Sequence, residues 1–367
     1  MEITPCISLC LSASEMPLEA LHIQSVRCIK TLDLKADQRW NWLIGANGAG
    51  KSSVLEAIHI LGTGQTWRRN PRHVQREDDN EYLVSAHLPD HFLALRRRGE
   101  TREIRYDGES LASAWMLLDI LPLQSLHDDN SHFVAGTAED RRRVLDWGIY
   151  YADHYYGTVF RQYRRALQQR NAWLKSGYGQ QPWDDGVIAT GEEIQQRRQA
   201  HLATVQPEVA TLWERWSGSL SGLSLHLHSG WKEGLALGDC LLRDQEQDRE
   251  MGYTHSGPHR ANLAFRVRGK AALDILSRGQ LRVLGLAYRL AQVKILKQAG
   301  LPLPTILIDD FAAELDASAR DWWVKELDLL GVQVFAAVTA AGQIPAAVSR
   351  GGHFCLAAGQ LEKETAS

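Results

Sequence analysis

A glycine-rich turn that joins an apolar segment to an amphipathic segment constrains this chain more than any other feature. Residues 41–61 read NWLIGANGAGKSSVLEAIHIL, and the part from Gly45 to Ser52 (GANGAGKS) fits the pattern GxxxxGK[ST]. The apolar residues 40–44 predict a short buried strand, and the residues after the turn predict an amphipathic helix, which is the context that this pattern requires. The sequence therefore predicts an α/β fold with a phosphate-binding loop at the start of a helix.

The residue types of this loop suit the phosphate chain of ATP. Glycines let backbone N–H groups turn inward around phosphates, and the helix N-terminus adds partial positive charge. We expect Lys51 to reach the β- and γ-phosphates and the Ser52 hydroxyl to hold Mg²⁺. The predicted nucleotide-binding residues of the loop are Gly45, Ala46, Asn47, Gly48, Ala49, Gly50, Lys51, Ser52 and Ser53. A chance glycine-rich turn is the alternative, and the flanking strand and helix argue against it.

A second apolar segment ends in two aspartates. The segment PTILIDDFAAELD, from Pro304 to Asp316, has a buried-strand pattern that stops at Asp309 and Asp310. Carboxylates at the carboxyl edge of a parallel sheet face the ligand crevice. Asp309 is the candidate Mg²⁺ carboxylate. Asp310 is the candidate base or water-orienting group, so Asp310 and Lys51 are the candidate catalytic residues. Solvated aspartates at a helix start are the alternative.

The stretch LSRGQLRVLGLAYRLAQ, from Leu276 to Gln292, predicts an amphipathic helix with an unusual first turn. Ser277 is a suitable N-cap, but Gly279 lies in the first turn, where glycine costs helix stability. An ordinary capped core helix is one interpretation. Another follows from the order of the motifs, which resembles that of ABC-type ATPases. The phosphate-binding loop, this helix, the paired aspartates and AELD correspond in that order to Walker A, signature, Walker B and D-loop.

In the ABC class, the signature helix of one subunit faces the γ-phosphate of ATP held by a second subunit. The resemblance implies that Ser277, Gly279 and Gln280 complete a nucleotide site across an ATP-dependent homodimer, where glycine allows close approach of backbone to phosphate. Two residues depart from the class: Asp310 stands where many members have glutamate, and Thr339 where many have histidine. A shorter carboxylate and a hydroxyl in place of imidazole predict slow hydrolysis, as in a switch.

Basic residues concentrate in a long segment of helical pattern. The chain has a formal net charge of −3, but residues 141–175 hold eight Lys/Arg and two Asp, which is +6 locally. Further basic clusters lie at 68–76 and 95–106, and such patches indicate a surface that binds a phosphate backbone. The candidate DNA contacts are Arg68, Arg69, Arg141, Arg142 and Arg143. For each patch alone, a solvated face is an equally good interpretation.

The segment THSGPHRA places three further polar residues before a predicted strand. His255, His259 and Arg260 could contact phosphate or DNA, although loop hydrogen bonds are the simpler interpretation. The five cysteines show no zinc spacing, and no apolar run approaches the roughly 18 residues of a membrane span. We expect a cytoplasmic protein without a membrane partner. Residues 1–18 are expected to form a disordered extension, and residues 1–15 need not belong to the native protein.

Several motifs together resemble one family. GANGAGKSS, RRVLDWGIYY with QRNAWL, THSGPHRA, LSRGQL and IDDFAAELD occur in the order of the bacterial DNA replication and repair protein RecF family, over roughly residues 19–367. The resemblance implies an ABC-type ATPase head of α/β class, split in sequence, with an inserted α-helical lobe. The expected segments are an extension (1–18), the first part of the head (19–120), the Arg-rich lobe (121–251) and the second part of the head (252–367).

The same resemblance implies a function. It implies ATP and Mg²⁺ as cofactors, weak DNA-dependent ATPase activity, and binding to double-stranded DNA and to DNA gaps or junctions. It further implies work with RecR and RecO and help in loading RecA on single-stranded DNA, in repair, replication and SOS induction. Two alternatives stay open at this point: the ATPase subunit of an ABC transporter, and a non-hydrolysing scaffold that binds ATP only to dimerise.

Overall fold

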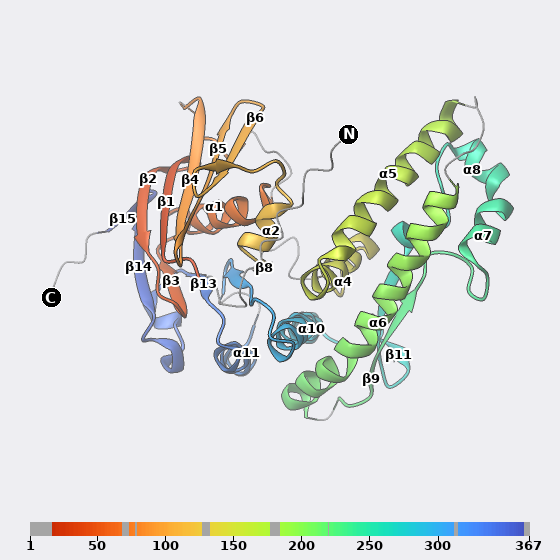
Figure 1. Ribbon diagram of the computed structural model, residues 1–367. Helices are drawn as coiled ribbons and strands as arrows, with labels where there is room; N and C mark the ends of the chain where they lie inside the picture. The colour runs from red at the N-terminus through yellow and green to blue at the C-terminus, as the bar shows by residue number, and fades with distance from the viewer. Residues whose placement is uncertain are drawn as a thin grey trace. The chain divides into compact units, whose positions relative to one another are not determined.

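The computed structural model describes residues 17–67, 73–77, 79–126, 133–176, 184–218, 220–311 and 315–362 (Figure 1). Two compact units are present in the chain. The first unit contains residues 1–127, 297–314 and 323–367, and the second contains residues 128–296 and 315–322. Among the residues that the structure describes, no helix is both long and apolar enough to cross a membrane.

A parallel sheet forms the centre of the first unit. Its strand order is β15-β14-β3-β13-β12-β8, in which β14, β3, β13, β12 and β8 are mutually parallel and β15 pairs antiparallel with β14. The strands are β3 (Trp40–Ile44), β8 (Leu123–Leu126), β12 (Thr305–Ile308), β13 (Val334–Val338), β14 (Gly352–Ala357) and β15 (Gln360–Leu361). Because β3 and β12 both lie beside β13 and run parallel to it, the segments that follow β3 and β12 leave the sheet at the same edge.

An antiparallel sheet completes the first unit, in the order β2-β1-β4-β5-β6-β7. The strands are β1 (Ala20–Val26), β2 (Ile29–Lys35), β4 (Glu81–Leu88), β5 (His91–Arg98), β6 (Thr101–Tyr106) and β7 (Glu109–Ser110). Helix α1 (Lys51–Thr63) contacts strands of both sheets. Its residues Val54 and Ile58 are fully buried in the same core as Leu21 of β1 and Phe335 of β13. The core of this unit therefore lies around α1, which fixes where the helix begins.

Helices dominate the second unit. They are α4 (Ala138–Ala152), α5 (Tyr155–Ser176), α6 (Asp184–Ser217), α7 (Leu237–Arg243), α8 (Gln245–Met251), the 3₁₀ helix η2 (Pro258–Arg260), α9 (Ala272–Ile275) and α10 (Arg278–Gln298). A small antiparallel sheet has the order β11-β10-β9, with β9 (Leu223–His228), β10 (Asn262–Val267) and β11 (Lys270–Ala271). Buried Leu145, Tyr163, Ile194 and Leu241 form a separate core between α4, α5, α6 and α7.

The remaining elements are α2 (Met116–Ile120), α11 (Ala317–Leu330), η3 (Ala341–Gln343) and η4 (Ala346–Val348). The division into units differs from the predicted segments at both ends, because the second unit begins at residue 128 instead of 121 and also contains residues 315–322. The second unit continues to residue 296, whereas the predicted lobe ends at residue 251. The reason is that β10 pairs with β9, and that Gln292 of α10 donates a hydrogen bond to the Val144 carbonyl of α4. The predicted mixed α/β architecture, with the strand at residues 40–44 and a helix after the loop, is confirmed.

Candidate nucleotide-binding site

The glycines of the loop between β3 and α1 are required by its geometry. Gly48 and Gly50 have φ values of 82° and 108°, in the left-handed region that favours glycine. A Cβ on Gly45 would lie 2.4 Å from the Leu356 carbonyl oxygen of β14, so the close approach of these two backbones also requires glycine. The hairpin of β14 and β15 makes a second contact with the loop. In this contact the Gly359 N–H donates to the Ala49 carbonyl over 2.9 Å.

Lys51 is the first residue of α1 and bends back over the loop. Its Nζ donates to the carbonyl oxygens of Gly45, at 2.7 Å, and Ala46, at 2.9 Å. Burial lowers the pKa of the Lys51 ammonium, and the nearby charges of Asp309 and Asp310 oppose that effect. The ammonium therefore lies at the mouth of the loop and within the electrostatic influence of the paired aspartates.

Ser52 and Asp309 meet at the edge of the parallel sheet. The Ser52 Oγ donates to Asp309 Oδ1 over 2.9 Å. Asp309 is the first residue after β12, and its own N–H donates to the Leu126 carbonyl of β8 over 2.9 Å. A hydroxyl and a carboxylate oxygen at hydrogen-bond distance form a hard donor set that suits Mg²⁺. The residues present therefore fit the ion that the sequence predicts.

Asp310 follows in an unusual backbone conformation. Its φ is 55°, in the left-handed region, and its side chain is exposed. The next residue, Phe311, is 1% exposed, donates its N–H to the Ala337 carbonyl and packs edge-to-face on Trp42 at 5.1 Å. In the part of the chain that the structure describes, the Asp310 carboxylate has neither a hydrogen bond nor an ion pair. The carboxylate is therefore exposed to solvent, while the backbone on either side of it is held by the hydrogen bonds of Asp309 and Phe311.

Thr339 lies directly after β13 and is bonded within its own turn. Gln343 Oε1 accepts from the Thr339 N–H at 2.8 Å and from the Thr339 hydroxyl at 3.0 Å. The sequence did not point to Gln343, because a glutamine five residues after the end of a strand carries no strong signal. The hydroxyl that replaces the usual histidine is therefore already hydrogen-bonded in this turn.

The candidate signature residues lie in the second unit, where they form a reciprocal cap on α10. The Ser277 N–H donates to Gln280 Oε1 at 2.8 Å, and the Gln280 N–H donates to Ser277 Oγ at 3.3 Å. This is the capping box S-x-x-Q, so the prediction that Ser277 caps the helix is confirmed. Gly279 is exposed, and no atom of the described residues lies within 4 Å of the position that its Cβ would take. With respect to the described residues, the first turn of α10 is therefore accessible to an external group.

Two of the candidate DNA-binding arginines donate hydrogen bonds to acceptors inside the second unit. Arg141 Nε donates to Asn262 Oδ1 at 2.8 Å and its NH1 donates to the Gly136 carbonyl at 2.7 Å. Arg142 NH1 donates to the Ala261 carbonyl at 2.7 Å. Burial lowers the pKa of both guanidinium groups. These contacts give Arg141 and Arg142 a part in holding the chain before β10.

The other basic residues differ in their surroundings. Arg143 is 71% exposed and forms an ion pair with Glu139 at 2.6 Å. Arg68 and Arg69 lie outside the described residues. Arg164 and Arg165 on α5 are exposed, and neither has a hydrogen bond or ion pair with another described residue. These last two residues belong to the basic segment 141–175 but were not among the candidate DNA contacts.

The parallel sheet, the loop after β3 and the aspartates after β12 define a P-loop ATPase head of the ABC class. The family described as RecF/RecN/SMC N terminal domain matches residues 17–349. An Smc head domain from Pyrococcus furiosus aligns over 88% of this chain and 90% of its own, with a TM-score of 0.53 and 14% identity. The fold is thus that of the heads found in this superfamily.

More specific relatives are the proteins named DNA replication and repair protein RecF. The one from Stutzerimonas stutzeri is 36% identical over 332 residues, which cover 87% of this chain and 89% of the relative. The one from Vibrio vulnificus is 33% identical over 339 residues, 90% of this chain and 94% of the relative. The chain belongs to the RecF family of DNA replication and repair proteins.

A solved structure has the same fold over almost its whole length. It is the recombination mediator protein RecF-ATPrS in the RecFOR pathway, and it aligns over 96% of this chain and 99% of its own with a TM-score of 0.83. The two sequences are 22% identical, so this likeness concerns the fold alone.

Proposed function

We propose that this protein is an ATP-dependent DNA-binding protein of recombinational repair and replication-fork maintenance. The observation that carries the proposal is the 2.9 Å contact between Ser52 Oγ and Asp309 Oδ1, in a chain of the RecF family. That contact brings a phosphate-loop hydroxyl and a strand-end carboxylate to one place, which is the arrangement that a Mg²⁺-dependent nucleotide site needs.

Each residue of the loop has a proposed part in holding ATP. The backbone N–H groups of residues 45–50 and the start of α1 bind the phosphates, and Ser53 lies in the first turn of that helix. Lys51 exchanges its two carbonyl partners for the β- and γ-phosphates. Ser52 and Asp309 would hold Mg²⁺. When bound, the ion would supply positive charge beside the phosphates. Asp310 orients water or accepts its proton, since its carboxylate is exposed and unpaired with any described residue.

Dimerisation on ATP is the proposed consequence of the open start of α10. Ser277, Gly279 and Gln280 offer a hydroxyl, exposed backbone and a helix N-terminus, which together suit an anion. In this proposal they meet the γ-phosphate held by a second copy. ATP then favours the dimer because the added contacts exist only in the dimer, and hydrolysis releases it.

The biological setting is proposed from the family. The relatives are named as DNA replication and repair proteins, and the solved neighbours are named as recombination mediators in the RecFOR pathway. We propose that the chain binds DNA at single-strand gaps or junctions in the cytoplasm and acts with RecR and RecO. In this proposal it helps to load RecA on single-stranded DNA, which leads to SOS induction. Weak DNA-dependent hydrolysis accompanies this cycle.

A titration with duplex, gapped and single-stranded DNA tests the proposal, with Mg²⁺ and with ATP, ADP or no nucleotide. ATP is expected to tighten DNA binding, and DNA to tighten ATP binding by the same factor. Binding that is absent with every DNA, or that is indifferent to ATP, would contradict the proposal.

A non-hydrolysing ATP-gated scaffold is a second candidate. Two observations favour it: the carboxylate at position 310 is the shorter aspartate, and the Thr339 hydroxyl is already bonded to Gln343. Measured turnover separates the two functions, because a scaffold dimerises on ATP without releasing phosphate. No comparable observation favours a transporter subunit, and the family assignment argues against it.

A further inference from the structure

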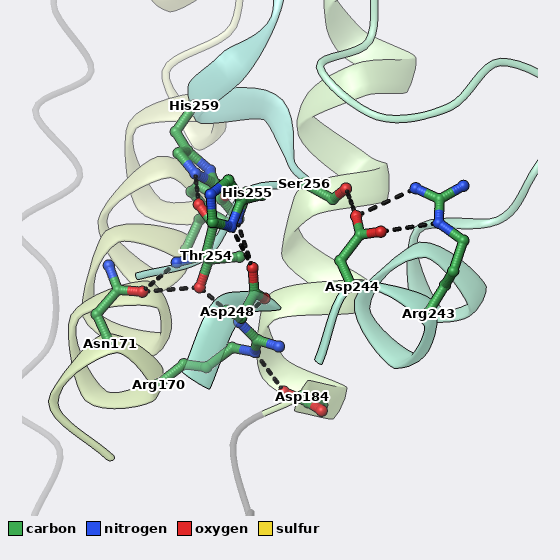
Figure 2. A network of polar contacts seen from close by, with 11 residues as sticks. Arg170, Asn171, Asp184, Arg243, Asp244, Asp248, Thr254, His255, Ser256 and His259 are labelled. Atoms are coloured by element: carbon green, nitrogen blue, oxygen red, sulfur yellow. Dashed lines mark hydrogen bonds and ion pairs between the residues drawn. The ribbon is translucent and has the colours of Figure 1, made fainter. Parts of the chain in front are cut away.

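The segment that precedes β10 is fixed by buried side chains of the second unit (Figure 2). Arg170 and Asp248 are both fully buried, and Arg170 NH1 donates to Asp248 Oδ2 and to Thr254 Oγ1, each at 2.7 Å. The Thr254 hydroxyl in turn donates to Asn171 Oδ1 at 2.7 Å. Asp248 Oδ1 accepts from the His255 backbone N–H at 2.9 Å and lies 2.7 Å from its Nδ1. The backbone at residues 254–255 is therefore held by α5 and α8.

His259 is a structural residue in this segment. Its Nε2 lies 3.0 Å from the Thr254 carbonyl, which can only accept, so Nε2 carries the proton. The Tyr163 hydroxyl, 2.6 Å from Nδ1, then donates to that nitrogen. Burial lowers the pKa of His259 to about 4, so the ring is neutral at pH 7. His259 is thus engaged on both nitrogens and is not a contact for a charged ligand.

Arg260 is arranged differently. It is exposed, and its guanidinium carbon lies 5.2 Å from the ring centre of Tyr253. The Tyr253 ring also packs against the His255 ring, with centres 4.4 Å apart. The described part of the chain provides no carboxylate partner for Arg260. This guanidinium is therefore positioned by an aromatic ring on a fixed backbone, while its hydrogen-bond donors remain available.

Further positive charge lies near Arg260. Arg142 of α4 donates to the carbonyl of Ala261, the residue after Arg260. Burial lowers the pKa of Arg142, and the charges of Arg198 and Arg260 lower it further. Glu139 and Asp146 act in the opposite direction. The positive charges of Arg142 and Arg260 therefore repel one another at the segment before β10. An anion bound there would relieve that repulsion.

We propose that Arg260, supported by Tyr253, is a contact for the phosphate backbone of duplex DNA. This inference rests on the proposed function, because it assigns a contact to the DNA that the protein is proposed to bind. A planar guanidinium held in one orientation suits phosphate oxygens, and little conformational entropy remains to be lost on binding. Single-strand binding would favour an open aromatic ring on which bases stack, but the Tyr253 ring already contacts two neighbours.

The test compares two exposed arginines that each lie over an aromatic ring. Arg260→Gln removes the proposed contact. Arg249→Gln is the matched control, because Arg249 is an exposed arginine of the same unit and lies 5.0 Å from the Trp173 ring. Arg260→Lys retains the charge without the planar group. Binding of labelled duplex DNA of two unrelated sequences is measured at several salt concentrations with ATP and Mg²⁺.

For Arg260→Gln, the slope of log affinity against log salt should become shallower by about 0.9 per bound protomer, equally on both sequences. Arg260→Lys should keep most of the wild-type slope, and Arg249→Gln all of it. A wild-type slope in Arg260→Gln, or an equal loss in Arg249→Gln, would overturn the inference and leave the proposed function intact. A wild-type protein that binds ATP but no DNA would overturn both. Unaltered ATP affinity and thermal unfolding in the variants show that the fold is retained.

Discussion

The Ser52 hydroxyl donates to Asp309 Oδ1 over 2.9 Å, although the two residues are 257 positions apart in the chain. Ser52 is placed by α1, which is buried between two sheets, and Asp309 by the end of β12. Neither side chain needs to travel far to share a metal ion. The contact also means that, before an ion enters, the carboxylate and the hydroxyl satisfy one another.

The first prediction concerns this pair. Ser52→Ala removes a proposed Mg²⁺ ligand, so the gain in ATP affinity that Mg²⁺ confers on the wild type should be largely lost. Ser52→Thr keeps a hydroxyl and should retain most of that gain. Calorimetric titration of ATP with and without Mg²⁺ measures the difference, and a Mg²⁺ effect of wild-type size in Ser52→Ala would contradict the assignment.

The second prediction separates binding from hydrolysis. Lys51→Ala should weaken ATP binding, because it removes the cation at the mouth of the loop. Asp310→Asn should bind ATP normally and lose turnover, because it keeps the side-chain shape but removes the base. Asparagine also tolerates the positive φ of this position, so the backbone should not change. Wild-type turnover in Asp310→Asn would show that the carboxylate has no part in hydrolysis.

The third prediction concerns the open start of α10. Ser277→Arg places bulk and positive charge at the proposed dimer contact and leaves the phosphate-binding loop unaltered. The variant should bind ATP as a monomer, fail to dimerise and hydrolyse little. Sedimentation of both proteins with ATP, ADP and no nucleotide measures this. A wild type that stays monomeric with ATP and DNA, or a variant that dimerises normally, would count against the proposal.

The fourth prediction divides the arginines by their surroundings. Arg164→Glu combined with Arg165→Glu should weaken binding to all duplex sequences alike, because both side chains are exposed. Arg141→Ala should instead lower the free energy of unfolding by roughly 2 kcal/mol, because it leaves partly buried acceptors without their donor. Urea unfolding and DNA titration on the same preparations distinguish the two effects. A DNA defect without a stability defect in Arg141→Ala would reverse its assignment.

The fifth prediction concerns pH. Burial lowers the pKa of His259 and of His201 to about 4, whereas an imidazole in an unfolded chain titrates near 6.5. Because the folded pKa is the lower one, each neutral ring contributes stability that is present above pH about 6.5 and is lost as the pH falls toward 4. The free energy of unfolding should decrease by roughly 3 kcal/mol per histidine across that window.

Urea unfolding between pH 7.5 and pH 4.5 checks this pH dependence. In His259→Gln the decrease should be smaller by about the share of one histidine, because glutamine does not titrate. His22→Asn is the control, since His22 is part of an exposed pair with Asp33. A pH dependence of wild-type size in His259→Gln would contradict the assignment.

The sequence signals that predict the candidate nucleotide site are local. A strand, a glycine turn and a helix start lie within 21 residues of sequence (41–61), and the capping box of Ser277 and Gln280 spans a single turn. Asp309 and Asp310 follow a strand of four buried residues, which the apolar run shows directly. In each case the signal depends on neighbours in the chain, whereas the contact between Ser52 and Asp309 depends on the sheet that brings them together.

The basic segment could be interpreted only in part. The local charge of residues 141–175 includes Arg141, whose donors are used inside the second unit, and Arg170, which is fully buried. Arg170 pairs with Asp184, 14 positions further along the chain, and with Asp248, 78 positions further, so a count over residues 141–175 includes the cation without its anions. Surface charge therefore cannot be read from a window of sequence when its ion pairs form over long distances.

The phosphate-binding loop is supported by the hairpin of β14 and β15, so it can take its final shape only after that hairpin has been synthesised. Gly45 abuts the Leu356 carbonyl, and Ala49 accepts a hydrogen bond from Gly359. β3 lies between β13 and β14, both of which leave the ribosome some 300 residues after it. A nascent chain thus carries the complete loop sequence for most of its translation without the strands that shape it. We therefore expect a chain that is interrupted before β14 and β15 are synthesised to lack a loop shaped to bind nucleotide.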